Sequence, residues 1–178
     1  MVREKLHLTE LNRLTLNEFR QAFKRPVDLI LLNIRSAGNV GSMFRSADAF
    51  RIHKIWLCGI SPQPPDRELS KTALGAEKSV SWEYRSDALA LIQELKEQGF
   101  HILAVEHTNE STPLDKLEPL EQPVVFVLGN EVFGIDDSVL NHCDACIEIP
   151  QFGTKHSLNV SVCAGIVLWH YTHQLTVA

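Results

Sequence analysis

Short apolar segments alternate with segments of helical pattern along most of this 178-residue chain. The apolar segments, which indicate strands, are residues 27–34, 54–60, 101–107, 124–128 and 146–150. They are continuous apolar runs, which is typical of parallel strands covered by helices on both faces. The helical patterns, several of them with capping or stop signals, are residues 16–24, 42–50, 68–74, 87–98 and 157–173. The pattern predicts an α/β fold with a mostly parallel sheet covered by helices on both faces.

Length and composition fit one such domain and exclude several classes of protein. At 178 residues and 44% hydrophobic content, the chain is long enough for one core and too short for two ordinary domains. No apolar run approaches the roughly 20 residues of a membrane helix, and residues 1–7 lack the apolar stretch of a secretory signal. Four cysteines are too few for a disulfide scaffold, so we expect a cytoplasmic protein without a membrane partner.

The charge of the chain is unevenly distributed. The net charge of −5 argues against a protein that coats nucleic acid by charge alone. Residues 1–60, however, hold ten Lys and Arg against five Asp and Glu, whereas residues 61–178 hold seven against 17. A basic first third hints at a local anionic partner. Composition alone favours the alternative that solvated faces simply differ in charge.

The loop over residues 33–47 follows the first strand, where ligands bind in open α/β sheets. Its glycines and small polar residues lead into a helix N-terminus, which is a natural site for an oxyanion or phosphate. Arg45 is expected about one helical turn inside that helix, able to fork onto a phosphate. The chain contains neither a Gly-x-Gly-x-x-Gly fingerprint nor a Gly-Lys-Ser/Thr loop. An ordinary turn with a capped helix and a surface Arg remains the alternative.

Two later loops also follow strands and carry polar side chains. Glu131 lies between two glycines after the strand at residues 124–128, and its alternative role is to cap a helix that starts near residue 136. In the loop at 149–161, Ser157 is the predicted N-cap of the last helix. Asn159 would then lie in the first helical turn, where propensity gives little reason for Asn. It is either a core hydrogen-bonding residue or a substrate contact.

Three motifs stand in these loops: Asn-Val-Gly-Ser-x-x-Arg, Leu-Gly-Asn-Glu-x-x-Gly and Ile-Pro-x-x-Gly-x-x-x-Ser-Leu-Asn-Val-Ser. In this order they closely resemble the signature motifs of the SpoU (TrmH-type) RNA ribose 2′-O-methyltransferases of the SPOUT superfamily. The resemblance covers the chain from about residue 27 to its end. It implies a C-terminal deep trefoil knot through the segments around residues 128–131 and 149–162. We therefore expect a short basic helical segment over residues 1–26 and a methyltransferase domain over residues 27–178.

The resemblance also implies a reaction, a cofactor and a set of site residues. The reaction transfers a methyl group from S-adenosyl-L-methionine to a ribose 2′-hydroxyl. The positions that match the family's cofactor site, used mainly through backbone groups, are Leu128, Gly129, Ile149 and Leu158. The positions that match its active site are Asn39, Arg45, Glu131, Ser157 and Asn159. The end of the preceding strand, residues 106–108, is expected to border the pocket.

Roles for the matched active-site residues follow from their chemistry. Arg45 stays protonated and is a poor base, so we expect it to bind a phosphate and stabilise developing alkoxide charge. Asn39 and Asn159 are expected to make substrate and active-site hydrogen bonds. Glu131 is expected to orient the active-site loop or Arg45.

The resemblance implies RNA as substrate and a homodimer with the active site near the subunit interface. A final helix that is apolar on most sides is consistent with this, because it needs cover on both faces. Transfer RNA is favoured over ribosomal RNA because the chain is compact, with a grip expected from the N-terminal cations Arg3, Lys5, Arg13, Arg20, Lys24 and Arg25. One alternative is a non-catalytic RNA-binding protein that keeps the fold. A nucleotide-binding oxidoreductase is disfavoured by the missing Gly-x-Gly-x-x-Gly.

Several other residues are assigned to the core or the surface. Cys143 and Cys146 form a Cys-x-x-Cys without a second ligand pair, so we expect no metal. Trp56 and Trp169 are expected to pack in the core. Trp82 and Tyr84 are better candidates for a surface contact, and His156 for a loop or RNA-facing position.

Overall fold

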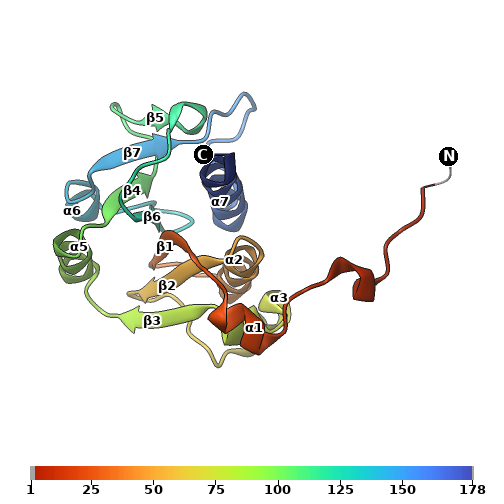
Figure 1. Ribbon diagram of the computed structural model, residues 1–178. Helices are drawn as coiled ribbons and strands as arrows, with labels where there is room; N and C mark the ends of the chain where they lie inside the picture. Colours follow the sequence, from red (N-terminus) through yellow and green to blue (C-terminus); the bar gives the residue numbers. More distant parts are fainter. Residues whose placement is uncertain (1–2, 178) are drawn as a thin grey trace.

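A single parallel sheet organises the computed structural model, which describes residues 3–177 (Figure 1). Within this range the sheet has seven strands in the order β3-β2-β1-β6-β4-β7-β5. The strands are β1 (Arg25–Leu32), β2 (Ile52–Cys58), β3 (Ser81–Arg85), β4 (His101–Val105), β5 (Thr112–Pro113), β6 (Val124–Leu128) and β7 (Ala145–Glu148). Each neighbouring pair among them is parallel. The prediction of an α/β fold with a parallel sheet is confirmed.

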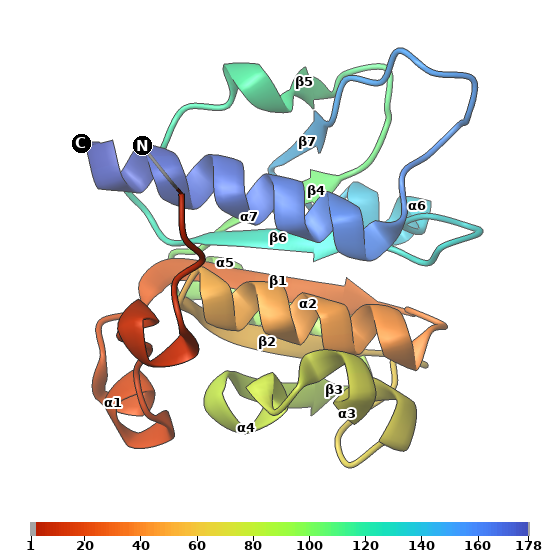
Figure 2. The same cartoon turned by 90° about the vertical axis from the view of Figure 1, so that its right-hand side faces the viewer.

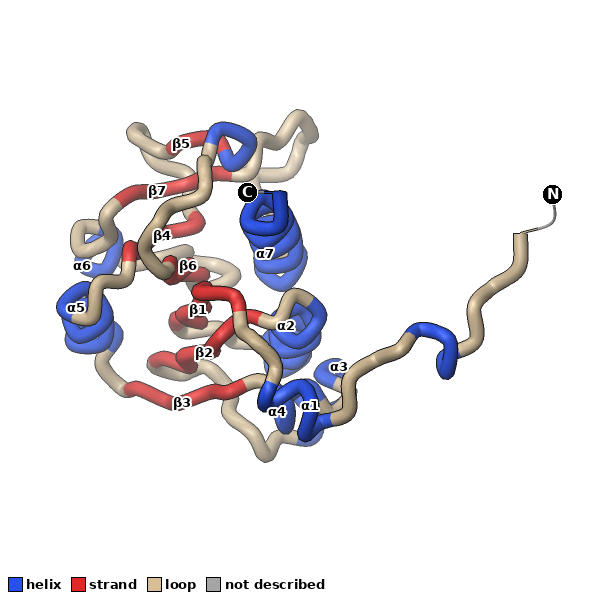
Figure 3. Tube along the Cα trace, viewed as in Figure 1, coloured by secondary structure: helices blue, strands red, loops and turns tan. Residues whose placement is uncertain are grey.

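Helices cover both faces of this sheet (Figures 1 and 2). The helices are α1 (Leu16–Gln21), α2 (Ala37–Ala49), α3 (Arg67–Ala73), α4 (Ala76–Ser79), α5 (Ala88–Glu97), α6 (Asp137–Leu140) and α7 (Val160–Val177), with 3-10 turns η1 (Leu8–Leu11) and η2 (Leu114–Lys116). Helices α2 and α7 lie on one face, and α5 and α6 lie on the other. The segment before α1 runs away from the rest of the chain (Figure 3).

Strand β1 shows why the apolar runs are continuous. Leu29 and Leu31 belong to the buried cluster under α2 and α7, whereas Ile30 and Leu32 belong to the cluster under α5. Successive side chains of a strand point to opposite faces, so a strand buried on both faces is apolar at every position. The two short edge strands β3 and β5 lack this signal and were not predicted.

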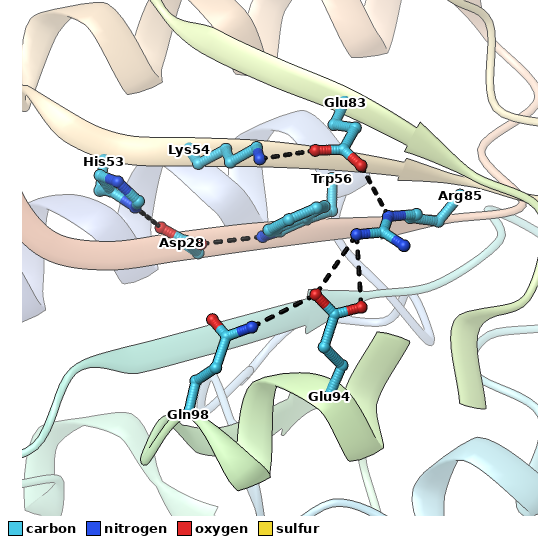
Figure 4. A network of polar contacts seen from close by, with 8 residues as sticks. All are labelled: Asp28, His53, Lys54, Trp56, Glu83, Arg85, Glu94 and Gln98. Carbon is cyan, nitrogen blue, oxygen red and sulfur yellow. Dashed lines mark hydrogen bonds and ion pairs between the residues drawn. The ribbon is translucent and has the colours of Figure 1, made fainter. Parts of the chain in front are cut away.

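A buried carboxylate interrupts the apolar pattern of β1 on the α5 face (Figure 4). The Asp28 side chain is fully buried; it accepts a hydrogen bond from Trp56 Nε1 at 2.8 Å and pairs with His53 Nδ1 at 2.8 Å. The hydrogen bond with Asp28 raises the pKa of His53. Lys54 lies over the Trp56 ring, 3.7 Å from its centroid. The partners offset the cost of burying the charge, and Trp56 is a core residue as predicted.

Helix α2 begins at Ala37, five residues before its predicted start. The Ser36 hydroxyl accepts from the Asn39 backbone N–H at 3.2 Å, which makes Ser36 the N-cap. Gly41, which suggested a turn, allows a close approach to α3, because a Cβ there would overlap the Leu69 carbonyl oxygen and the Thr72 hydroxyl. Arg45 is therefore more than two turns inside the helix, so its predicted place one turn from the start is wrong.

Helix α7 begins at Val160, so Ser157 is not its N-cap and Asn159 is not in its first turn. The Asn159 side-chain oxygen accepts from the Ser161 backbone N–H at 2.9 Å and from Val162 N at 3.4 Å. Its backbone carbonyl accepts from Cys163 N at 2.9 Å. Asn is as good an N-cap as Ser. Residues 157 and 158 still belong to the loop, so the helix is capped by Asn159 and not by Ser157.

One face of α7 is open in the single chain, contrary to the prediction of burial on both faces. Val162 and Trp169 are 48% and 56% exposed, so Trp169 is not a core residue here. Its ring stacks on that of His173 at 5.4 Å. Among residues 3–177, no helix combines the length and apolar character needed to cross a membrane.

The two aromatic residues of β3 differ in burial. Trp82 is half-buried and packs against the core, so its predicted surface role is not supported. Tyr84 is 37% exposed and donates from its hydroxyl to the Gly59 carbonyl at 3.1 Å.

Candidate functional site

The loops that follow β1 and β6 both lie at the carboxyl end of the sheet (Figure 2). The Glu131 carboxylate accepts from the backbone N–H groups of Arg35 at 2.9 Å and Ser36 at 3.1 Å. It also accepts from the Asn39 side-chain amide at 2.9 Å. Glu131, in the second motif loop, thus fixes the first motif loop in place. Its alternative role as the cap of the helix after residue 136 is wrong.

Asn39 links this pair to the third motif. Its side-chain oxygen accepts from the Asn159 amide at 3.1 Å while its amide donates to Glu131. Since both ends of the Asn39 amide are engaged, its orientation is determined. The structure therefore brings Asn39, Glu131 and Asn159 together from three segments far apart in sequence.

Opposing effects act on the ionisation of Glu131. Burial raises the pKa of its carboxyl group, but the hydrogen bonds from Arg35, Asn39 and Ser36 outweigh burial and lower the pKa below its usual value. Glu131 is therefore ionised at neutral pH, and its negative charge lies beside the N-terminus of α2. A carboxylate is favoured at that position.

A cavity of about 570 Å³ lies next to these residues, between the ends of β4, β6 and β7 and the start of α7; we call it the strand-end cavity. Its lining includes Glu106, His107, Gly129, Asn130, Glu131, Gly134, Glu148, Ile149, Gln151, His156, Ser157, Leu158, Asn159 and Cys163. The volume is within the range of small-molecule sites. Three of the four residues matched to the cofactor site line it; Leu128 is buried at the end of β6 and is outside the lining.

The end of β4 supplies one wall of the strand-end cavity. Glu106 accepts from the Ile135 backbone N–H at 3.1 Å, and Gly134 has a φ of +69°. A Cβ at Gly134 would overlap the Glu106 carboxylate, so glycine is required for this contact. Glu106 and His107 border the pocket as predicted, whereas Thr108 is not in the lining.

A second polar cluster, not predicted from sequence, ties β4 to the loop after β7. His107 Nδ1 lies 3.0 Å from Glu148, and the Ser111 hydroxyl donates to the same carboxylate at 2.6 Å. The Ser111 and His107 hydrogen bonds lower the pKa of Glu148. His107 Nε2 contacts Gln151 Nε2 at 3.0 Å. No local spacing in the sequence signals this cluster, because it joins residues 107–111 to residues 148–151, which are far apart in the chain.

Asn130 is a structural residue of the site that sequence reasoning missed. Its amide donates to the Asn33 carbonyl at 2.7 Å, and its side-chain oxygen accepts from Val132 N at 2.9 Å. The first bond fastens the end of β6 to the end of β1, and the second shapes the turn before Gly134. The available signal was an Asn after a strand-terminal glycine, a position where Asn favours turns.

The structure does not bring Arg45 to the strand-end cavity. Its exposed side chain lies in a separate hollow with Ser42, Thr72 and Gly165. Within residues 3–177 the Arg45 guanidinium makes no hydrogen bond or ion pair. Ser157, by contrast, lines the strand-end cavity and is exposed.

The donor set of the strand-end cavity fits S-adenosyl-L-methionine. That cofactor is a cationic sulfonium with an apolar chain, an adenosine and an amino acid end. The carboxylates of Glu106, Glu131 and Glu148 suit its positive charges, while Ile149 and Leu158 offer apolar surface. Backbone groups of the loop residues are available for hydrogen bonds.

A metal does not fit the cysteines of the Cys-x-x-Cys. Burial raises the pKa of the Cys143 thiol to about 12, which disfavours the thiolate that a metal needs. In the part of the chain that the structure describes, no three metal-ligating side chains cluster.

Comparisons with known proteins agree with these features. The model of the SpoU rRNA Methylase family matches residues 26–169. A 23S rRNA (guanosine-2′-O-)-methyltransferase of Neisseria meningitidis is 35% identical over 147 residues, which cover 80% of this chain and 56% of that protein. The chain thus spans little more than half the length of this curated relative.

Solved structures show the same fold. The A. aeolicus TrmH/SpoU tRNA modifying enzyme superposes with a TM-score of 0.81 at 25% identity, over 90% of this chain and 82% of that one. An AdoMet-bound rRNA methyltransferase from Sinorhizobium meliloti gives a TM-score of 0.80 at 25% identity, over 88% and 60% of the two chains. The match to the family model covers most of the chain, and this protein belongs to the SpoU rRNA Methylase family.

Proposed function

We propose that this protein transfers a methyl group from S-adenosyl-L-methionine to a ribose 2′-hydroxyl of RNA. The observation that carries the proposal is the hydrogen-bonded set of Glu131, Asn39 and Asn159, which joins three motif loops beside the strand-end cavity. Family membership supports it, as do the names of relatives, which include an RNA 2′-O-methyltransferase and an AdoMet-bound enzyme.

We assign S-adenosyl-L-methionine to the strand-end cavity, held mainly by the backbone at Gly129, Ile149 and Leu158, which line it, whereas Leu128 lies behind the lining. When bound, it supplies an electrophilic methyl group on a sulfonium. Side chains that are apolar or absent leave the backbone accessible, which supports this assignment.

The nucleophile is a neutral hydroxyl, whose proton must be displaced as the new C–O bond forms. Asn39 and Asn159 each keep spare hydrogen-bonding capacity beyond the contacts described above. We assign them to the reacting ribose, with Ser157 as a further contact from the cavity wall. Glu131 is a positioning residue, since it acts through Asn39 and the loop at residues 35 and 36.

We assign Arg45 to the phosphate next to the reacting ribose, where it also stabilises developing alkoxide charge. Because Arg45 lies outside the strand-end cavity of its own chain, we infer a homodimer in which Arg45 of the partner subunit completes the site. The exposed apolar side chains of α7, Val162 and Trp169, support a self-association surface. Gly165 of α7 lines the hollow that holds Arg45, so that surface and Arg45 are neighbours.

We favour tRNA over rRNA as the substrate. The tRNA modifying enzyme named above superposes over 82% of its chain, against 60% for the rRNA methyltransferase structure. The rRNA reaction is the second candidate, supported by the name of the Neisseria relative. A non-catalytic RNA-binding protein remains an outcome of the test below.

We also propose that the C-terminal segments form a deep trefoil knot and that residues 1–26 are a distinct basic segment ahead of a domain at 27–178. The similarity to TrmH/SpoU structures supports the first proposal. The exposed course of the chain before α1 supports the second, although β1 begins at Arg25. Tracing the chain in an experimental density map tests both.

Incubation with tritiated S-adenosyl-L-methionine and total RNA tests the function. Nuclease digestion and mass spectrometry of the nucleosides should then identify a 2′-O-methylated product. Arg45→Lys should bind the cofactor normally in calorimetry but lose nearly all turnover, because Lys lacks the planar fork of Arg. Near wild-type turnover in this variant contradicts the role of Arg45, and RNA binding without transfer supports the non-catalytic alternative.

A further inference from the structure

A groove of about 610 Å³ lies between residues 12–16, the C-terminal half of α2, and α4; we call it the α2–α4 groove. Four cationic side chains line it: Arg13, Arg45, Arg51 and Lys78. All four residues are exposed. The lining contains one acidic residue, Asp48. A local excess of positive charge on a chain of net charge −5 calls for an anionic ligand.

The cations of the α2–α4 groove are not neutralised by neighbouring side chains. None of the four forms a side-chain hydrogen bond or ion pair with the described residues, 3–177. Asp48 is engaged by the hydroxyl of Ser79. Some cations elsewhere are paired, as the part-buried Lys54 is with Glu83 at 2.8 Å and the exposed Lys96 is with Asp144 at 2.7 Å. Within the described range, the groove therefore presents four unpaired cations beside a single carboxylate that is already engaged.

The walls of the groove are held in place. The Arg20 guanidinium donates to the Lys78 carbonyl at 2.9 Å, which fastens α1 to α4. Thr15 caps α1 through a capping box with Glu18, and Phe19 is 6% exposed beneath the groove. The cations thus stand on a preformed surface, which lowers the entropy cost of binding.

Two smaller hollows adjoin the groove and continue the basic surface. One, of about 570 Å³, shares Arg45 and Ala49 with the groove and adds Lys71. The other, of about 230 Å³, shares Ala49 and Arg51 and adds Arg25. No residue of α7 lines the groove itself, whereas α7 residues line both adjoining hollows.

We infer that the α2–α4 groove binds the phosphodiester backbone of the RNA substrate, away from the reacting nucleotide. The inference rests on the proposed function and extends it to residues that carry no motif, Arg51 and Lys78. Separate cations along an open groove match a polyanion better than one small anion, and Arg forks bind phosphate in bidentate fashion. Such contacts position RNA without reading its sequence. Arg45 lines both the groove and the adjoining hollow, so the RNA backbone would pass Arg45 on its way from the groove to the active site.

The test measures nitrocellulose filter binding of unfractionated tRNA by the full chain at several salt concentrations. The test variant is Arg51→Gln with Lys78→Gln, and the matched control is Lys116→Gln, an exposed cation on η2. Each phosphate contact changes the binding constant by roughly five- to eightfold per tenfold change in salt. If the two proteins bind equally at about 1 M salt, the double variant, which lacks two contacts, should bind roughly 25- to 60-fold more weakly than the wild type at about 0.1 M salt. The charge-conserving pair Arg51→Lys with Lys78→Arg should bind like the wild type.

Calorimetric binding of S-adenosyl-L-methionine and thermal unfolding should be unchanged in these variants, which excludes misfolding as the cause. Equal losses in the double variant and in Lys116→Gln would overturn the inference, and so would unaltered binding in the double variant. Preferential binding of polyglutamate over tRNA would overturn it in favour of an acidic protein partner. The wild type could bind RNA but transfer no methyl group, while the double variant loses RNA binding. That result would support RNA binding by the groove and refute the proposed function.

Discussion

Replacing Glu131 with Gln removes the charge that holds the first and second motif loops together. Glu131 presents two oxygens to the N–H groups of Arg35 and Ser36 and to the Asn39 amide. Gln has one acceptor oxygen, and its amide N–H groups face these donors. The substitution therefore breaks at least one hydrogen bond and leaves a donor unsatisfied.

The magnitude follows from these bonds. A hydrogen bond to a charged group contributes about 1.5–3 kcal/mol, so losing one or two at this half-buried site should destabilise the fold by roughly 2–4 kcal/mol. Asn39→Ala removes one of the same bonds. The coupling between the two substitutions in a double-mutant cycle should be between about 0.5 and 3 kcal/mol.

The pH dependence gives a sharper readout. Because the pKa of Glu131 is lowered in the folded state, its contribution is fully present above the unfolded pKa of about 4.3 and is lost as pH falls through the folded pKa. Urea unfolding followed by circular dichroism should show the full difference between wild type and Glu131→Gln at neutral pH. The difference should shrink in acid.

Glu121→Gln is the matched control for Glu131, since Glu121 is exposed and its side chain has no partner within residues 3–177. It should change stability by less than about 0.5 kcal/mol. A Glu131→Gln protein as stable as this control at neutral pH, or a difference that does not change with pH, would refute the reasoning.

Three further predictions concern α7 and the buried carboxylate. Asn159→Ala should cost about 1–2 kcal/mol in urea unfolding because it removes the N-cap and the hydrogen bond to Asn39, whereas Ser157→Ala should cost less than about 0.5 kcal/mol. The raised pKa of His53, caused by its hydrogen bond with Asp28, stabilises the fold below the unfolded pKa of about 6.5 and ceases to do so as pH rises through the folded pKa. His53→Gln should remove that loss of stability in pH-dependent thermal unfolding. Trp169→Glu should shift the proposed dimer to monomer in light scattering; an unchanged mass would exclude this surface as the interface.

The order of strands and helices could be predicted because burial on both faces leaves continuous apolar runs. The strand at Val124–Leu128 was located to the residue for this reason. Helix starts were less predictable where two caps compete. Ser157 and Asn159 are both good caps, and only the path of the loop decides between them.

The candidate site was predictable where function resides in local motifs. Asn39, Glu131 and Asn159 could be selected from sequence, but their mutual hydrogen bonds depend on strand order and loop path. The cluster of His107, Ser111 and Glu148 had no signal at all, since the loop after β4 and the end of β7 meet only in the folded chain. The position of Arg45 outside the cavity could not be predicted while its helix was expected to start at residue 42.

The central claim is tested most directly by mass spectrometry of nucleosides from RNA that the purified protein has methylated. RNA from a strain lacking the gene is the appropriate substrate, because the target ribose should be unmodified there. We expect one 2′-O-methylated nucleoside whose formation requires S-adenosyl-L-methionine and is lost in Arg45→Lys. A methyl group found on a base rather than a ribose, or no transfer to tRNA or rRNA from that strain, would contradict the account.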